Sequence, residues 1–347
     1  MATQATGSAP MTFDNVRRQG TLHRILASQI TYVLAALVIL MIVMAIASDK
    51  FLTERNLQNV AQNFSYIAIA ALGQTLVIIL AGIDLSVGSV MALGAVATSL
   101  AMDATADWGL FIDWPGLALL VAVAAGVAAG GVVGLINGVL IARLGLSPFV
   151  TTLGMLSVCR SLVYVVTQGR GSPTAGPAKD LFRSLGNDPL FGLLPPSLIY
   201  MAVLAVMIWY LLRHMQWGRH VFAIGGNEKA AALTGVPVER VKISVYVFCS
   251  ALAGFTGVLL LAWLGSAPAN TAVGYELRVI AASVIGGANL TGGLGGPLGA
   301  VTGAALIEVI RNGLILGGVQ PYWQDFFVGV FIILAVLLDR IRSRRAA

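Results

Sequence analysis

An acidic residue stands alone in a long apolar part of the chain. In the stretch GIDLSVGS, residues 82–89, Asp84 is followed by Ser86, and no charged residue occurs in residues 56–83. An Asp at the start of a helix can accept hydrogen bonds from the free amides of the next turn, and its charge complements the helix dipole. An ionisable side chain inside a membrane-spanning region is, in contrast, a candidate for lining a pathway. Asp84 is therefore expected either to cap a helix at a break in the chain or to line a pathway, and the sequence leaves both open.

The pattern around Asp84 returns near the other end of the chain. The segment GIDLSVGSVMALGAV at 82–96 aligns without gaps with GANLTGGLGGPLGAV at 287–301, where Asn289 and Thr291 take the places of the Asp and the following Ser. Interrupted helices in matching positions of two repeats point to the binding site of a transporter. We infer a duplication. The number of spans between the copies favours parallel repeats, which become inverted if one short segment fails to span.

The composition requires a membrane. Of the 347 residues, 58% are hydrophobic and 10% are charged, whereas soluble domains have about 45–50% apolar and about 25% charged residues. Several charge-free stretches exceed the roughly 20 residues that cross a bilayer as a helix. Unbroken apolar runs exclude a β-barrel, which needs short alternating strands, and the first run is too long for a cleaved signal peptide. The fold class is therefore an all-α polytopic membrane protein.

We expect about ten transmembrane helices in one domain at 25–340, between a cytoplasmic segment, 1–24, and a basic cytoplasmic tail, 341–347. The segments on the same side as the amino terminus hold most of the 21 Lys and Arg residues. Because basic residues concentrate on the cytoplasmic side, both termini are expected in the cytoplasm. The expected spans are 25–47, 59–81, 85–102, 115–142, 147–166, 191–212, 242–264, 276–290, 295–316 and 321–338.

Several other kinds of site are not expected. The net charge of +6 arises from residues between the spans, so it does not indicate a nucleic-acid partner. Cys159 and Cys249 lie in apolar stretches and are interpreted as small buried residues rather than as a disulfide. We expect no catalytic residues, no metal site and no cofactor. Because the chain has no G-x-x-x-x-G-K-[ST] sequence, any use of ATP requires a partner.

The internal segment 213–242 is long and basic, and within it NEKAAALTG predicts a short helix. Asn227 can cap this helix, the alanines after it favour helix, and Gly235 with Pro237 ends it. One interpretation is a helix that merely connects two spans. The other, which we favour, is a docking element for a soluble partner, because a short helix of small residues has no apolar face to bury.

Five motifs together resemble one known family. They are GIDLSVGS, AIGGNEKAAALTGVPVERVK at 223–242, GYEL at 274–277, GGANLTGG at 286–293 and NGLILGGV at 312–319. In this order and spacing they resemble the permease subunits of bacterial ribose-type ABC importers, which carry ribose, xylose, arabinose or galactose. The likeness extends over residues 25–340.

The resemblance implies a type II importer permease fold in the bacterial inner membrane, with no covalent chemistry in this subunit. It also implies a second permease subunit, contact with membrane lipid, an ABC ATPase subunit on the cytoplasmic loop and a periplasmic sugar-binding protein. The residues that match the family's coupling segment, and so are expected to contact the ATPase, are Asn227, Glu228, Ala231 and Gly235.

A sugar pathway needs polar groups and some aromatic surface that bind weakly enough to release cargo. Each candidate has an alternative role, because buried amides also join helices and Trp residues also anchor at the membrane interface. The candidates by residue type and span position are Asn63, Tyr66, Gln74, Asp84, Asn137, Thr151, Trp263, Asn270, Glu276, Asn289 and Asn312.

Some residues depart from the family pattern. Arg278 follows GYEL where the family commonly has an acidic or small polar residue, and GGANL replaces GGTSL. These differences suit a sugar derivative or an anionic sugar, although Arg278 as a side chain that extends to the membrane interface is the preferred interpretation. The alternative functions are a permease of the same superfamily for branched-chain amino acids or nucleosides, and an ion-coupled carrier that works alone.

Overall fold

The computed structural model describes residues 29–106, 109–190, 192, 194–320, 323, 326–327, 329–330 and 333. Helices make up nearly all the regular structure of this part, and two short strands, β1 (Ser172–Pro173) and β2 (Ser266–Ala267), pair antiparallel. The expected all-α architecture is confirmed. The predicted segments 1–24 and 341–347, and most of the predicted span 321–338, lie outside the described residues.

Eight helices of the described part are long and apolar enough to cross a membrane, and each matches a predicted span to within a few residues. Pro residues at the first turn begin four of them, as expected from the fixed backbone angle of Pro. The eight helices are α3 (Gln29–Ala47), α4 (Glu54–Ile79), α5 (Val87–Ala104), α7 (Pro115–Ala142), α8 (Pro148–Thr167), α10 (Pro196–His214), α13 (Val238–Leu264) and α15 (Pro297–Leu316).

The predicted span 276–290 is wrong in length. The structure has α14 (Tyr275–Ile285) there, and its 11 residues cover about 16 Å, against a hydrocarbon core of about 30 Å. The helix ends because a glycine-rich stretch follows at once, with φ of 99° at Gly287 and 90° at Gly292. Short helices that the sequence did not predict are α6 (Gly109–Asp113), α9 (Lys179–Asn187) and α11 (Gln216–Gly226).

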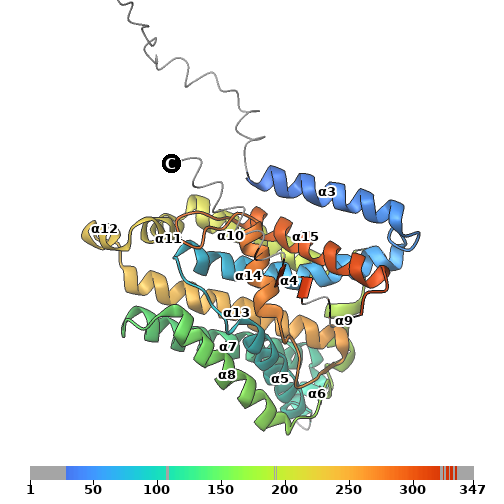
Figure 1. Cartoon of the computed structure of the whole chain (residues 1–347). Helices are drawn as coiled ribbons and strands as arrows, with labels where there is room; N and C mark the ends of the chain where they lie inside the picture. The colour runs from blue at the N-terminus through green and yellow to red at the C-terminus, as the bar shows by residue number, and fades with distance from the viewer. Residues whose placement is uncertain are drawn as a thin grey trace, which may run out of the picture.

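The long helices form a bundle whose centre is α4 and α13, while α3 lies at its edge (Figure 1). One end of the bundle carries α9, and the other carries α12 (Glu228–Leu233), so these are named the α9 end and the α12 end. Helix α4 begins near α9, since the Gln62 side chain donates a hydrogen bond to the Gly186 carbonyl, and it ends against α11. It therefore runs from the α9 end to the α12 end.

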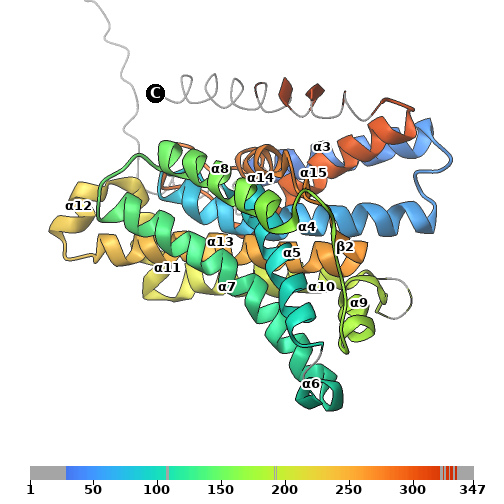
Figure 2. The same ribbon diagram turned by 90° about the horizontal axis from the view of Figure 1, so that it is seen from below.

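Glycines set the distance between α7 and α13, which run side by side (Figure 2). A Cβ at Gly130 would overlap the Ser250 carbonyl oxygen, and one at Gly134 would overlap that of Tyr246. Spacing by four residues places these glycines on one helix face, where backbones can approach closely as membrane helices prefer.

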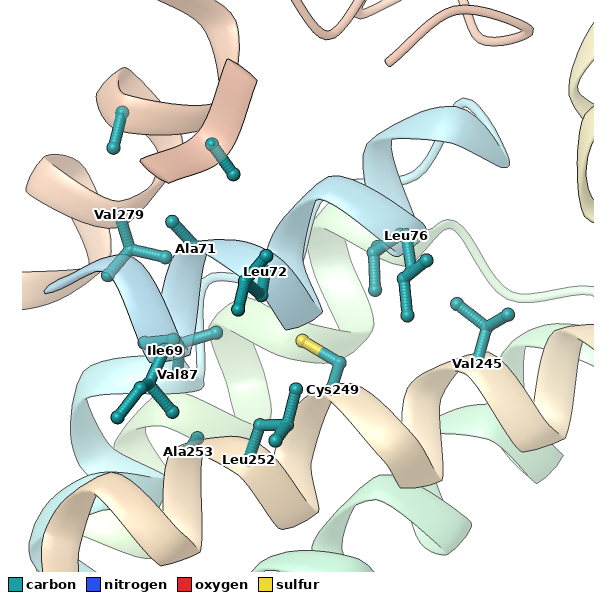
Figure 3. Close-up of a cluster of buried hydrophobic side chains, with 14 of the residues drawn as sticks. Ile69, Ala71, Leu72, Leu76, Val87, Val245, Cys249, Leu252, Ala253 and Val279 are labelled. Carbon is teal, nitrogen blue, oxygen red and sulfur yellow. The ribbon is translucent and has the colours of Figure 1, made fainter. Parts of the chain in front are cut away.

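The apolar core joins α4, α5, α13 and α14. Figure 3 shows Leu72 and Leu76 of α4 facing Cys249 and Leu252 of α13. Cys249 is fully buried and Cys159 nearly so, and both thiols are free. Each cysteine therefore behaves as a small buried residue, as predicted.

Candidate functional site

The chain between α4 and α5, residues 80–86, is a mostly buried non-helical break in which Ala81 is exposed, and Asp84 at its centre has no exposed surface. The Asp84 Oδ1 atom accepts hydrogen bonds from the Ser86 amide at 2.8 Å and from the Ser86 hydroxyl at 2.6 Å. The carboxylate thus shapes the turn that precedes α5, rather than capping the first amides of the helix itself. In this conformation Asp84 faces protein on all sides.

Side chains from three other helices bind the break. The Gln74 amide of α4, with its nitrogen turned toward the Asp84 carbonyl, spans the backbone of Asp84 with contacts of 3.1 and 3.2 Å. The Asn137 side chain of α7 donates to the Ser86 hydroxyl at 3.2 Å. Buried non-helical backbone needs such partners, because its polar groups otherwise remain unpaired. The predicted residues Gln74, Asp84 and Asn137 therefore lie together.

On α8, Thr152 makes the contact with the break, and the predicted Thr151 does not. The Thr152 hydroxyl accepts from the Leu85 amide at 3.1 Å and lies 3.2 Å from the Ile83 carbonyl oxygen. The Thr151 hydroxyl donates to the Ser147 carbonyl of its own helix at 2.9 Å. Two adjacent threonines point in different directions on a helix, and the sequence alone does not tell which of them faces inward.

The second copy of the motif folds into the same turn. The Asn289 Oδ1 atom accepts from the Thr291 amide at 2.9 Å and from the Thr291 hydroxyl at 2.8 Å. Unlike Asp84, Asn289 is partly exposed, and α15 begins only at Pro297. The Gly293 amide donates to the Ile79 carbonyl at the end of α4, at 2.9 Å, so the two breaks are joined at the α12 end.

The two copies are parallel. Helices α4 and α14 both end at this junction of the breaks. Helices α5 and α15 then both return toward the α9 end, where Ser99 donates to the Pro173 carbonyl of β1 and Asn312 pairs with Asn56. The short α14 does not invert the second copy, because the non-helical chain after it continues to the junction, where Gly293 binds Ile79.

Several of the remaining pathway candidates make their contacts elsewhere in the bundle or are exposed. Tyr66 is fully buried, accepts from Gln62 at 3.0 Å and packs on Trp263 with ring centres 5.7 Å apart. Asn63 donates to the Asn59 carbonyl of its own helix. Asn270 is exposed in the segment after β2.

Asn312 is almost buried and exchanges two amide hydrogen bonds with Asn56, at 2.8 and 3.1 Å. This pair joins α15 to α4. The sequence offered Asn312 as a pathway residue but gave no indication of its partner. The structure places it as a link between helices, which is the alternative role for buried amides.

Charged residues near α14 form contacts that the sequence did not predict. Arg160 of α8 donates to the Thr271 carbonyl at 2.8 Å, and Glu276 lies against the first turn of α5, where a Cβ at Gly88 would overlap its carboxylate. A basic residue inside a predicted span was the signal for Arg160. The guanidinium of Arg278 lies 5.3 Å from the Tyr275 ring centre.

The buried Glu308 carboxylate, which is 3% exposed, forms a two-bonded ion pair with Arg311 at 2.8 and 2.9 Å. Glu276 and Glu308 are two of the acids inside the predicted spans, where a carboxylate could serve ion coupling. A carboxylate already paired in this way is compensated by protein rather than by a transported cation.

The loop helix α12 has the predicted form. Asn227 Oδ1 accepts from the Ala230 amide at 3.0 Å, and Gly235 ends the segment with φ of 85°. Glu228 binds Lys242 of α13 at 2.6 Å, and Ala231 is buried beneath the helix. Leu233, which was not singled out in the sequence, is 90% exposed. Leu233 is the one large apolar residue of the segment NEKAAALTG, and this was the signal that could have identified it.

Comparison with known proteins agrees with this architecture. The ribose import permease protein RbsC of Escherichia coli K12 is 40% identical over 308 residues, 88% of this chain and 92% of that protein. The L-arabinose ABC transporter permease protein AraH of Azospirillum brasilense is 34% identical, over 89% of this chain and 87% of that protein. The galactose/methyl galactoside import permease protein MglC of Haemophilus influenzae is 34% identical, over 88% of this chain and 92% of that protein.

Residues 56–336 match the sequence pattern of a protein family that is described as the permease component of the branched-chain amino acid transport system. The match includes both breaks, α12 and α13. A permease component moves a substrate without changing it, so the chain is not an enzyme. The resemblance that the sequence motifs indicated is confirmed, and the chain belongs to this family of transport permeases.

Proposed function

We propose that this chain is the membrane-spanning permease subunit of an ATP-binding-cassette importer, which carries a monosaccharide across the bacterial inner membrane. The cargo is a pentose, a hexose or a derivative of one. The observation that carries this proposal is similarity over nearly the whole chain to three permeases named for ribose, L-arabinose and galactose. The sugar names favour this cargo over branched-chain amino acids or nucleosides.

The structure of α12 supports ATPase docking at this helix. Six residues are too few for a helix that is stable alone in water, yet α12 is held at both ends by the Asn227 cap and by the turn at Gly235. Its anchored side buries Ala231, and its free side presents Leu233. A rigid helix with an exposed apolar tip is the form of a docking element, and an apolar pocket on the ATPase would cover Leu233.

Of the four coupling residues expected from the sequence, Asn227 and Gly235 shape α12 and Ala231 seats it on the bundle. Glu228 has a side chain 51% exposed even while it binds Lys242, so it remains available to a partner. The α12 end is then the cytoplasmic end, and both termini lie in the cytoplasm. A second permease subunit completes the pathway, and a periplasmic sugar-binding protein delivers cargo at the α9 end.

The break at 80–86 is the element of the pathway with a built polar environment. Side chains of α4 and α8 bind its backbone, and Asn137 of α7 binds its Ser86 hydroxyl, so its position depends on three helices at once. Motion of these helices relative to one another would change the conformation of the break, because it would move the side chains that bind it. We infer that the alternation between outward-open and inward-open states includes this rearrangement.

The test is uptake into liposomes that contain the chain, its candidate ATPase and its binding protein. A panel of pentoses, hexoses and sugar acids is supplied with and without ATP, and the sugar acids test whether Arg278 selects an anionic cargo. We expect ATP-dependent uptake of one class of monosaccharide. Uptake that continued without the ATPase would refute the proposal.

A further inference from the structure

Helix α11 approaches the junction of the two breaks through the backbone of its last two residues, and most closely at Gly225. A Cβ at Gly225 would overlap the Ile79 carbonyl oxygen and would lie 2.7 Å from the Gly293 amide nitrogen. These are the acceptor and the donor of the 2.9 Å hydrogen bond that joins the breaks. The backbone of α11 therefore rests directly on that hydrogen bond, without a side chain between them.

The contact continues on the other side of the junction. A Cβ at Gly292 would lie 2.6 Å from the Gly225 carbonyl oxygen and 3.0 Å from the Ala81 side chain. All the atoms involved belong to backbone or to Cβ groups, which cannot move aside as a flexible side chain can. A displacement of α11 is consequently transmitted to residues 79–81 and 292–293 together.

The other end of this connection is α12. Helix α11 ends at Gly226 and α12 begins at Glu228, so Asn227 alone separates them. Asn227 is fixed in turn by its bond to the Ala230 amide. Figure 1 shows α11 lying between α12 and the end of α4. A force on α12 thus reaches the breaks through one short, ordered connection.

We propose that Gly225 is the positioning residue through which movement of α12 shifts both helix breaks at once. This inference rests on the proposed function, because the force on α12 comes from the ATPase. Gly225 touches neither cargo nor nucleotide. Its role is to let α11 approach the Ile79–Gly293 hydrogen bond closely enough to move the ends of α4 and α14 as one unit.

The test replaces Gly225 by Ala and compares it with Gly226→Ala. The control residue is on the same helix, and a Cβ there would meet no atom within 4 Å. Both variants are reconstituted with the ATPase and binding protein, and sugar uptake per ATP hydrolysed is measured. We expect G225A to keep ATPase association and hydrolysis while uptake per ATP falls at least tenfold, and G226A to match the wild type. A purely structural role would lower hydrolysis and uptake together.

A second measurement does not depend on how G225A folds. The Gly226 Cα lies 3.4 Å from where a Cβ at residue 293 would be, so α11 and the second break adjoin here, and cysteines at 226 and 293 are introduced to cross-link them by a disulfide or, where the Cβ directions do not allow one, by a short bifunctional reagent with a cleavable disulfide. Cross-linked G226C–G293C is compared with the same variant after reduction, because the φ of 76° at Gly293 strains a cysteine in both. We expect uptake per ATP to persist in the cross-linked form, since α11 and the break move together.

The outcomes separate the two proposals. Loss of uptake on cross-linking with recovery on reduction, or wild-type uptake per ATP in G225A, would overturn the role of Gly225. Wild-type uptake that needed no ATPase would instead refute the proposed function.

Discussion

Replacement of Asp84 by Asn and by Leu measures what the buried carboxylate does. Its Oδ1 atom accepts two hydrogen bonds from Ser86, and hydrogen bonds to charged groups contribute about 1.5–3 kcal/mol each. Asp84→Leu removes both acceptors and leaves the Ser86 amide and hydroxyl buried without them, for a loss of about 3–6 kcal/mol in the free energy of unfolding. Asp84→Asn keeps the Oδ1 atom and is expected to lose much less.

The second break provides a control within the same chain. Asn289 already makes the same two bonds through its amide oxygen, at 2.9 and 2.8 Å. Asn289→Leu therefore removes equivalent bonds, but at a partly exposed position where solvent can replace them. We expect its destabilisation to be smaller than that of Asp84→Leu.

The assay is thermal unfolding of the purified chain in detergent, followed by uptake in the reconstituted complex. The expected order of stability is wild type, Asp84→Asn, then Asp84→Leu, with uptake following the same order. Equal loss of stability in the two Asp84 variants would refute the reasoning from the turn, because an Asn side chain supplies the same acceptor atom.

Three further predictions follow from single contacts. Leu233→Asp should abolish ATPase association without changing the stability of the chain, because Leu233 is 90% exposed; co-purification of the ATPase checks this. Ala231→Phe should abolish transport while the chain still inserts in the membrane, since the buried Ala231 has no room for a ring; normal uptake would contradict it. Gly130→Ala should destabilise the bundle by about 1–3 kcal/mol, because its Cβ would overlap the Ser250 carbonyl, whereas Gly131→Ala, which meets nothing within 4 Å, should be neutral in thermal unfolding.

Long apolar segments were predictable because a membrane helix needs only length and apolar composition. The eight long helices of the described part follow this rule, and α14 escaped it because glycines end it early. Helices α9 and α11 were not predicted, since they lie in polar connections where tertiary contacts outweigh local pattern. The cap at Asn227 and the turn at Gly235 were predictable because they depend on the chemistry of neighbouring residues.

The site was predictable to a smaller extent, for a physical reason. Asp84 was found because a lone carboxylate in an apolar run is conspicuous, and Gln74 and Asn137 because buried amides need partners. Residue type does not tell which face of α8 contacts the break. The sequence therefore predicted Thr151, whereas Thr152 binds. The Gly225 contact depends on the absence of a side chain, and many of the 40 glycines in the chain look alike in sequence.

The two breaks form the same turn but differ in charge, since one has Asp84 and the other Asn289. A carboxylate costs far more to bury than an amide, yet Asp84 of the first break is fully buried and Asn289 of the second is partly exposed. The turn does not require the charge, because Asn289 makes the same bonds. If Asp84→Asn keeps its stability but loses uptake, the carboxylate acts in a conformation other than this one, in which the helices around the break have separated and Asp84 meets the pathway. If Asp84→Asn keeps both stability and uptake, the only function of the Asp84 side chain is to form the turn.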